Sequence, residues 1–368
     1  MTDSIDIPER ERSRVPLWDN ARFITVALVV IGHAIQRLTI EDDHALLVYL
    51  FIYAFHMPAF AMISGYFSKS GPPNARQMSK VITDILLPYL IMESIWSLVK
   101  FLVEGKQTFN PSEPSWTLWF LLALGLFRLL LPYLALLRWP MLWVVLLSVG
   151  VGYLDNIDST FSLSRAIGIL PFFVLGWKVR EWGLIDRWRV VTGITWRVRG
   201  AAILLFAAWL LVVWINLDFF RAVDFKFWFF YDYSYVQLGG TQWWAGLVRL
   251  AVIALAVVLC AAFFVLVPRS KTWFTQFGQA TMYIYLLHSF LLYPLRETGF
   301  LQENATTLWL AIMIVGSVLV SILLATRPVR TIFRPLIEPK PRWLFIGDNV
   351  RRHSESRVDP TGSRRDRR

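Results

Sequence analysis

Residues 17–38 read LWDNARFITVALVVIGHAIQRL, an apolar helix-forming run that carries Arg22 near its start and His33 further along. Eleven residues at about 100° each make three full turns plus about 20°, so both side chains share one helix face, about 16 Å apart along the axis. Asp19, three residues before Arg22, can pair with the guanidinium and fix it. A cation at the rim and an imidazole at depth on one stripe suit a ligand with an anionic head and a reactive end.

The rest of the chain has the composition of a membrane protein. Of its 368 residues, 56% are hydrophobic and only 17% are charged, and the mean hydropathy is +0.50. A soluble globule of this size needs about a quarter of charged residues to cover its surface. The single cysteine, Cys260, excludes an intrachain disulfide, a CxxC redox pair and a cysteine-rich metal site. The first 16 residues are polar and lack the apolar core that a signal peptide requires.

Apolar stretches that can cross about 30 Å of hydrocarbon recur along the whole chain. They are residues 22–38, 45–67, 80–103, 116–134, 141–154, 163–179, 199–216, 242–267, 273–293 and 307–326. We therefore predict an all-α, polytopic integral membrane helix bundle of about ten transmembrane helices. Its domains are a polar cytoplasmic segment 1–16, a transmembrane domain 17–330 and a basic, disordered cytoplasmic tail 331–368.

The basic residues orient this bundle. With the N-terminus inside, the predicted cytoplasmic segments hold 29 of the 37 Lys and Arg residues, as the positive-inside rule requires when both termini are cytoplasmic. The predicted outer loops are acidic, as at residues 41–43, or aromatic, as at 217–241. The net charge of +11 then reflects the orientation of the protein in the membrane. We predict membrane lipid, and no nucleic acid, as a partner. The aromatic loop is either an interfacial belt or a platform for a sugar.

Several sequence features occur in the order found in a known family. They are the Arg22-to-His33 spacing, FHMPAFAMISGYF at 55–67, LPY at 87–89, WTLWFL at 116–121 and YIYLLH at 283–288. Over about residues 17–330 the chain resembles the membrane acyltransferase-3 family, most of all its fucose 4-O-acetylase-like branch. The resemblance implies a multi-pass enzyme of the bacterial plasma membrane. Such an enzyme moves a short acyl group, chiefly acetyl, from cytoplasmic acyl-CoA to a hydroxyl of an extracytoplasmic glycan, glycolipid or glycosylated metabolite.

The family motif, carried over to this chain, makes His33 the catalytic histidine and Arg22 its paired arginine. His33 acts either as the general base that deprotonates the acceptor hydroxyl, the role that we favour, or as a carrier of the acyl group. Arg22 can hold CoA phosphate through charge-assisted, bidentate hydrogen bonds. Acyl-CoA is then a donor substrate, with no cofactor permanently bound. The sequence has no HExxH, Walker or dinucleotide-binding motif that would indicate a metal, ATP or NAD.

The chain departs from the family pattern before its Leu-Pro-Tyr. Members commonly carry an R-x2-R pair there, whereas this chain has Val81 and Asp84. We expect Arg76 and Lys80, one or two turns earlier, to contact the CoA phosphates instead.

A second departure concerns the group that polarises the histidine. The acidic motif that some branches place in a middle helix has no counterpart in WTLWFL, so this group must come from elsewhere. Glu93, at a depth comparable to that of His33, is our candidate. A purely structural pairing of Glu93 is the alternative.

Other polar or aromatic side chains at membrane depth are candidates to line the cavity or bind the acceptor. His56 and His288 end the parallel phrases FIYAFH and YIYLLH, each with a tyrosine three residues earlier on the same helix face. They either make chance aromatic contacts or supply hydrogen bonds to the thioester and the acceptor. We place Ser64, Tyr285 and Trp119 in the same cavity, where Ser64 serves tight packing or an oxyanion contact.

Two other functions fit parts of the pattern. An exporter of a glycolipid or a small anion would also have many helices and buried charges. Transporters usually show repeated halves, and this sequence has no such repeat. A glycosyltransferase acting on polyprenyl-linked sugars would use outer-loop carboxylates, for which Glu41, Asp42 and Asp43 are weak candidates. The enzyme hypothesis is therefore preferred, and nothing in the pattern assigns an oligomeric state.

Overall fold

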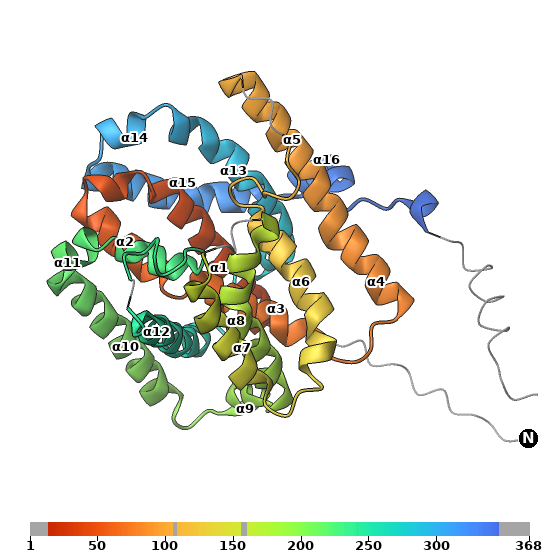
Figure 1. Cartoon of the computed structure of the whole chain (residues 1–368), viewed down its shortest axis with the longest axis horizontal. Helices are drawn as coiled ribbons and strands as arrows, with labels where there is room; N and C mark the ends of the chain where they lie inside the picture. Colours follow the sequence, from red (N-terminus) through yellow and green to blue (C-terminus); the bar gives the residue numbers. More distant parts are fainter. Residues whose placement is uncertain (1–13, 106–108, 156–159, 241, 346–368) are drawn as a thin grey trace, which may run out of the picture.

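The computed structural model describes residues 14–105, 109–155, 160–240 and 242–345, and within them the chain is helical without strands (Figure 1). The helices are α1 (Pro16–Ile35), α2 (Asp43–Tyr53), α3 (His56–Phe67), α4 (Ala75–Val81), α5 (Leu87–Glu104), α6 (Trp119–Leu134), α7 (Pro140–Gly150), α8 (Leu163–Glu181), α9 (Leu184–Val190), α10 (Thr195–Ile215), α11 (Leu217–Ala222), α12 (Ala245–Leu266), α13 (Thr281–Glu297), α14 (Phe300–Glu303), α15 (Thr307–Leu324) and α16 (Arg327–Ile337). The predicted all-α helix bundle is confirmed.

Each of the ten predicted apolar stretches contains a helix. Within the described residues, six helical segments are long and apolar enough to cross a membrane: Asp43–Phe67, Ala75–Glu104, Thr160–Glu181, Thr195–Ile215, Ala245–Leu266 and Thr307–Leu324. Two shorter apolar helices cover Trp119–Leu134 and Pro140–Tyr153. The count of about ten spans and the cytoplasmic position of both termini stay predictions.

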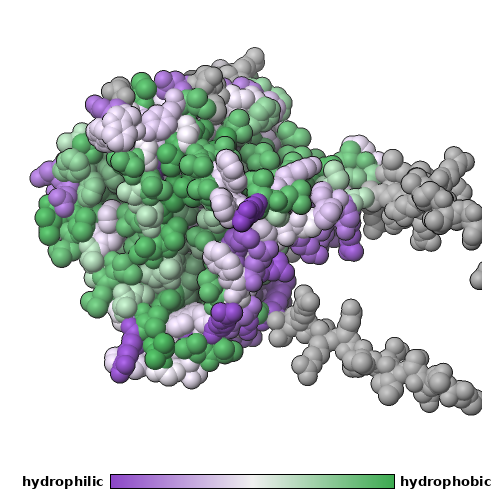
Figure 2. Space-filling model, turned by 60° about the horizontal axis from the view of Figure 1, so that its bottom comes forward, coloured by the Kyte–Doolittle hydropathy of each residue, from purple (hydrophilic) through white to green (hydrophobic). Residues whose placement is uncertain are grey.

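Burial divides the helices into a central group and a lipid-facing group. Fifteen of the twenty residues of α1 are buried, and α1 packs against α3, α13 and α15. By contrast, only 17% of the apolar window in α10 and 28% of that in α15 is buried within the protein. Figure 2 shows one face on which apolar residues form a broad surface, with hydrophilic residues gathered mainly on its right-hand side. A broad apolar surface together with helices of this length is typical of a protein that faces lipid.

Small residues allow α3 and α8 to pack closely. A side chain at Gly65 would overlap the backbone carbonyl of Phe173, and one at Gly176 would overlap that of Met62. Helices in a membrane gain little from hydrophobic burial, so such close backbone contact is a main source of their association. The Ser-Gly of the predicted second span therefore lies at a tight helix–helix contact.

Two predicted helices are interrupted. The stretch 45–67 breaks at Phe55, whose φ of −143° and ψ of −19° are not helical, so that His56 begins a new helix. The stretch 80–103 contains a π-helix at Ile82–Leu86, directly before Pro88 in the first turn of α5. Proline has no N–H to donate, which leaves carbonyls of the preceding turn free to adopt the wider spacing.

The C-terminal tail begins later than predicted. The prediction of disorder from residue 331 is wrong for residues 331–337, because α16 extends to Ile337. Its apolar residues Val329, Phe333 and Leu336 pack against the protein core, while arginines occupy other positions of the same helix. Low hydropathy concealed this amphipathic spacing. Residues 1–13 and 346–368 of the two predicted terminal segments lie outside the described residues.

Candidate functional site

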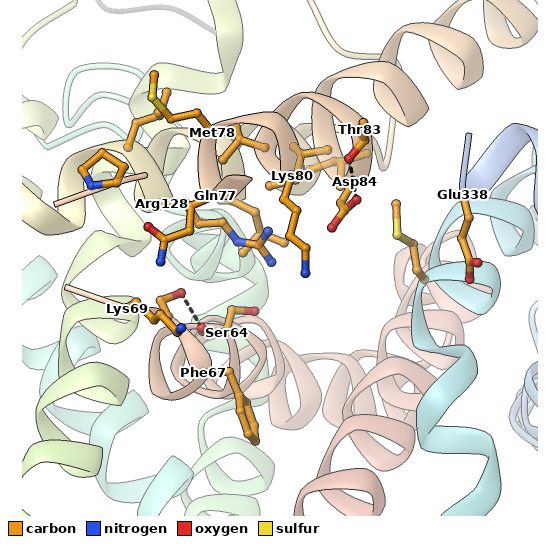
Figure 3. Close-up of a pocket in the computed structure, with 18 of the residues that line it drawn as sticks. Ser64, Phe67, Lys69, Gln77, Met78, Lys80, Thr83, Asp84, Arg128 and Glu338 are labelled. Carbon is orange, nitrogen blue, oxygen red and sulfur yellow. Dashed lines mark hydrogen bonds between the residues drawn. The ribbon is translucent and has the colours of Figure 1, made fainter. Parts of the chain in front are cut away.

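A cavity of about 1110 Å³ opens at the end of the bundle that carries the predicted cytoplasmic loops. Its walls come from α3, the α4–α5 segment, α6, the start of α13 and the residues that follow α16. Five cations line it, namely Arg22, Lys69, Lys80, Arg128 and Lys340, against the carboxylates Asp84 and Glu338. Figure 3 shows Lys80, Asp84 and Arg128 on one side of this space and Ser64 and Lys69 on the opposite side. The cavity is therefore basic, as a site for a phosphate-bearing ligand must be.

Arg22 lies in this wall as the first-span motif requires. Its Nη1 is 3.3 Å from Oδ1 of the buried Asp19, and its guanidinium lies 4.4 Å from the ring centroid of Phe67. The predicted Asp19–Arg22 pair is thus formed. The neighbouring Asn20 donates to the backbone carbonyls of Pro268 and Ser270 at 2.9 and 3.0 Å, which ties the start of α1 to the loop after α12.

The two cations found near the position of the family's missing arginine pair come from two different helices, Lys80 from α4 and Arg128 from α6. Lys80 lines the cavity, whereas Arg76 does not belong to its lining. Arg128 of α6 does line it, and its guanidinium lies close enough to Asp84 for their charges to interact. In the sequence Arg128 is one isolated cation near the end of an apolar helix, and no local spacing connects it with residue 84.

Three aromatic rings close the inner end of the cavity. Phe60 and Phe120 have ring centroids 5.1 Å apart, and Tyr285 lies 6.5 and 6.2 Å from them. The Tyr285 hydroxyl donates to the backbone carbonyl of Thr117, which fixes its position. We call Phe60, Phe120 and Tyr285 the aromatic floor. Ser64 also faces this cavity, with its hydroxyl donating to the Phe60 carbonyl at 3.0 Å.

Two of the three predicted histidines meet just beyond the aromatic floor. The ring centroid of His288 lies 6.2 Å from that of Tyr285 and 5.5 Å from that of His33. Nδ1 of His288 donates to the Ile284 carbonyl at 3.0 Å, so a neutral ring keeps Nε2 free as an acceptor. That Nε2 atom and Nδ1 of His33 are buried and have no hydrogen-bond partner among the described residues.

His56 approaches the same group from α3. Its Nδ1 donates to the Ile52 carbonyl at 2.9 Å, and its ring centroid lies 4.6 Å from that of Tyr53. It is close enough to His33 for a charge on one ring to act on the other. The parallel Tyr-to-His phrases therefore bring their histidines to one region of the bundle.

Glu93 does not reach the histidine directly. Its two carboxylate oxygens accept from the backbone N–H and the hydroxyl of Ser115, at 2.8 and 2.6 Å, and the Lys100 ammonium donates to the same hydroxyl at 2.8 Å. Direct polarisation of His33 by Glu93 is thus not the arrangement found. The carboxylate instead fixes the residue before Trp116, whose ring centroid lies 5.3 Å from that of His33.

Trp116 lies against His33, whereas Trp119 lies beside the aromatic floor, with its ring centroid 5.5 Å from that of Phe120. Trp116 has a φ of +37°, in the left-handed region that side chains other than glycine rarely adopt. Arg296 lies 4.6 Å from its ring centroid, and Arg165 lies 4.6 Å from that of Trp119. The sequence pattern indicated Trp119 and missed Trp116, although both belong to WTLWFL.

Comparisons with known proteins identify the family of the chain. Residues 16–326 match the profile of the family described as Acyltransferase domain, and the chain belongs to this family of acyltransferases. It is 26% identical over 246 residues to the Nodulation protein NolL of Mesorhizobium japonicum (strain LMG 29417 / CECT 9101 / MAFF 303099). That match covers 63% of this chain, which spans 61% of the length of NolL. No solved structure matches the chain significantly.

Proposed function

We propose that this protein transfers a short acyl group, chiefly acetyl, from acyl-CoA to a hydroxyl of a sugar-containing acceptor, with His33 as the general base. One observation carries the proposal. A basic cavity reaches from the predicted cytoplasmic end of the bundle to an aromatic floor, and the buried His288 and the half-buried His33 lie directly beyond that floor.

The cavity supports CoA as the donor. At about 1110 Å³ it is slightly larger than most small-molecule sites, which measure about 300–1,000 Å³, as a ligand of the size of CoA requires. Lys80 and Arg128 supply the charge that CoA phosphates require, and Arg22 adds a guanidinium already oriented by Asp19. The pantetheine arm then extends past Ser64 towards the aromatic floor. The three rings must part for the thioester to reach His33.

The histidine pair supports base catalysis. An unprotonated nitrogen of His33 takes the proton of the acceptor hydroxyl while the hydroxyl oxygen attacks the thioester carbonyl carbon. The C–O bond forms, the C–S bond breaks, and the proton passes from His33 to the departing CoA thiolate. His288 keeps an acceptor nitrogen towards this site, which can orient the His33 ring. Positioned base catalysis of this kind contributes about 10²–10⁴ to the rate.

The acceptor approaches from the opposite side. Trp116 and Trp119 offer apolar ring surface on which a sugar can stack, Trp116 beside His33 and Trp119 beside the aromatic floor. Donor and acceptor then meet at one histidine in a multi-pass protein of the bacterial plasma membrane. The donor comes from the cytoplasm, and the product belongs to the cell envelope.

Acetyl-CoA turnover in nanodiscs tests the proposal. We expect the wild type to release CoA from [14C]acetyl-CoA and His33→Gln to release at least about a hundredfold less, while both bind CoA with equal affinity in calorimetry. His44→Gln is the matched control, because His44 lies on the predicted outer surface beside Thr307. Equal turnover by wild type and His33→Gln would contradict the base role. No turnover together with no CoA binding would contradict the donor site and favour an exporter.

A further inference from the structure

A second group of cations surrounds His33 on the side away from the donor cavity. Arg37 follows His33 by four residues, and the backbone stays helical through residue 37, so both side chains share one face of the α1 segment. The stripe of the first span therefore carries Arg22 on the donor side of the histidine and Arg37 on the opposite side.

Arg296, at the end of α13, completes the group. Its guanidinium covers Trp116, the residue in contact with His33, and lies close enough to Arg37 for their charges to repel each other. Arg37 forms no ion pair within the described residues, and its Nε is buried without a hydrogen-bond partner. Arg296 Nε lies 3.4 Å from Oε1 of the adjacent, exposed Glu297, an ion pair without hydrogen-bond geometry. Glu104, which accepts from the Tyr293 hydroxyl, is a second carboxylate near Arg296.

Arg165 lies at the other edge of the same space. It pairs with Asp232 of the aromatic outer loop at 2.5 Å and covers Trp119. Its charge also acts on His33, as that of Arg296 does. Because Asp232 neutralises Arg165, the excess positive charge is concentrated at Arg37 and Arg296. We call Arg37, Arg296, Arg165, Trp116 and Trp119 the outer vestibule.

The strained backbone of Trp116 is a second, independent sign that this space serves a ligand. The left-handed conformation is unfavourable for a tryptophan, and the hydrogen bonds between Glu93 and Ser115 fix the residue that precedes it. The result is a tryptophan face with a guanidinium on it, directly beside the histidine. Two adjacent guanidinium groups whose Nε atoms lack hydrogen bonds form a favourable site for an anion, which supplies both hydrogen bonds and the opposite charge.

We propose that the outer vestibule binds an acceptor that carries an anionic group, a phosphate or a carboxylate, next to the sugar hydroxyl that is acylated. Arg37 and Arg296 hold the anion by charge-assisted hydrogen bonds, and Trp116 or Trp119 stacks on the sugar ring. The acceptor class is thus an acidic sugar or a phosphate-linked sugar. This inference rests on the proposed function, because it makes His33 the centre to which the anchored hydroxyl is presented.

Binding of three labelled sugars to the protein in nanodiscs tests the inference. Glucose 1-phosphate carries the phosphate, methyl glucuronide the carboxylate, and methyl glucoside neither. Saturating CoA fills the basic donor cavity during the measurement. We expect at least one charged sugar to bind about tenfold or more tightly than the neutral one, as a charge-assisted hydrogen bond predicts. A phosphate preference indicates a phosphate-linked glycan, and a carboxylate preference indicates an acidic sugar.

Two independent variants test whether the two arginines cause the preference for charged over neutral sugar. Arg37→Gln and Arg296→Gln should each reduce this binding preference to about twofold or less, and Arg296→Lys should restore part of it. Lys226→Gln is the control, since Lys226 pairs with Asp224 in the aromatic loop. Equal binding of the three sugars by the wild type, or a preference that survives both glutamine variants, would overturn the inference. Binding of charged sugars without label transfer from acetyl-CoA would refute the proposed acyl transfer and support the anion site. Transfer of the label to all three sugars with equal efficiency would support the acyl transfer and refute the anion site.

Discussion

Replacement of Arg128 by glutamine tests the donor cavity most sharply, because only the structure connects this residue with it. A hydrogen bond between a guanidinium and a phosphate contributes about 1.5–3 kcal/mol. Arg128 is exposed within an open cavity, and Lys80 and Arg22 remain, so the lower end of that range applies. A loss of about 1.5 kcal/mol raises the Kd for CoA about tenfold.

Calorimetry of CoA binding in nanodiscs measures this change. Arg138→Gln is the matched control, because Arg138 lies ten residues further on, outside the cavity lining and against Trp139. Asp84→Asn should act in the opposite direction and lower the Kd about two- to fivefold, since it removes a carboxylate that repels phosphate beside Arg128. If Arg128→Gln and Arg138→Gln change the Kd equally, or if Asp84→Asn weakens binding, the cavity is not the phosphate site.

Three further predictions concern packing and positioning. Gly65→Ala should lower the free energy of unfolding by about 1–3 kcal/mol, because the added methyl group meets the backbone of α8. Gly200 has open space around it, so Gly200→Ala should leave the free energy of unfolding unchanged or higher. Thermal unfolding in detergent compares the two variants. Glu93→Gln should lower kcat and change the KM for CoA little, because it loosens the Ser115–Trp116 segment that packs against His33. If Glu93 has a purely structural role, the variant should instead lose thermal stability and keep its kcat. Burial raises the pKa of Tyr235 to about 12. The hydrogen bond that Tyr235 donates to a backbone carbonyl at 2.7 Å therefore stabilises the fold fully below pH 10, and this stabilisation is lost as the pH rises towards 12. The difference of about 1 kcal/mol in the free energy of unfolding between wild type and Tyr235→Phe should narrow above pH 10, and a constant difference would contradict this role of the hydroxyl.

The sequence predicts what depends on local pattern. Each of the ten apolar stretches that hydropathy located contains a helix, and the helical period placed Arg22 and His33 on one face of α1 with the Asp19 pair at its start. The repeated Tyr-to-His phrases singled out His56 and His288, which both lie near His33, and their roles stay predictions. Each of these signals lies within one helix or recurs in a short phrase.

The sequence could not predict contacts between segments far apart in the chain. Arg128 faces Asp84 across 44 positions, and Glu93 binds Ser115 across 22, with nothing in either phrase to connect them. The amphipathic helix α16 was not predicted, because its arginines lower its mean hydropathy below that of a membrane-spanning helix. The break at Phe55 does have a local signal, because Pro58 in the first turn of α3 has no N–H to donate to the carbonyl of Ala54.

We propose that CoA lies in the basic cavity with its thioester beyond the aromatic floor. A cryo-EM map of the protein in nanodiscs, with a non-hydrolysable acetyl-CoA analogue and an antibody fragment as a fiducial, measures this directly. We expect phosphate density between Lys80 and Arg128 and the acyl group beside His33, with Phe60, Phe120 and Tyr285 displaced to admit the pantetheine arm. Nucleotide density at any other face, or an acyl group that stays on the cavity side of an unmoved floor, would contradict it.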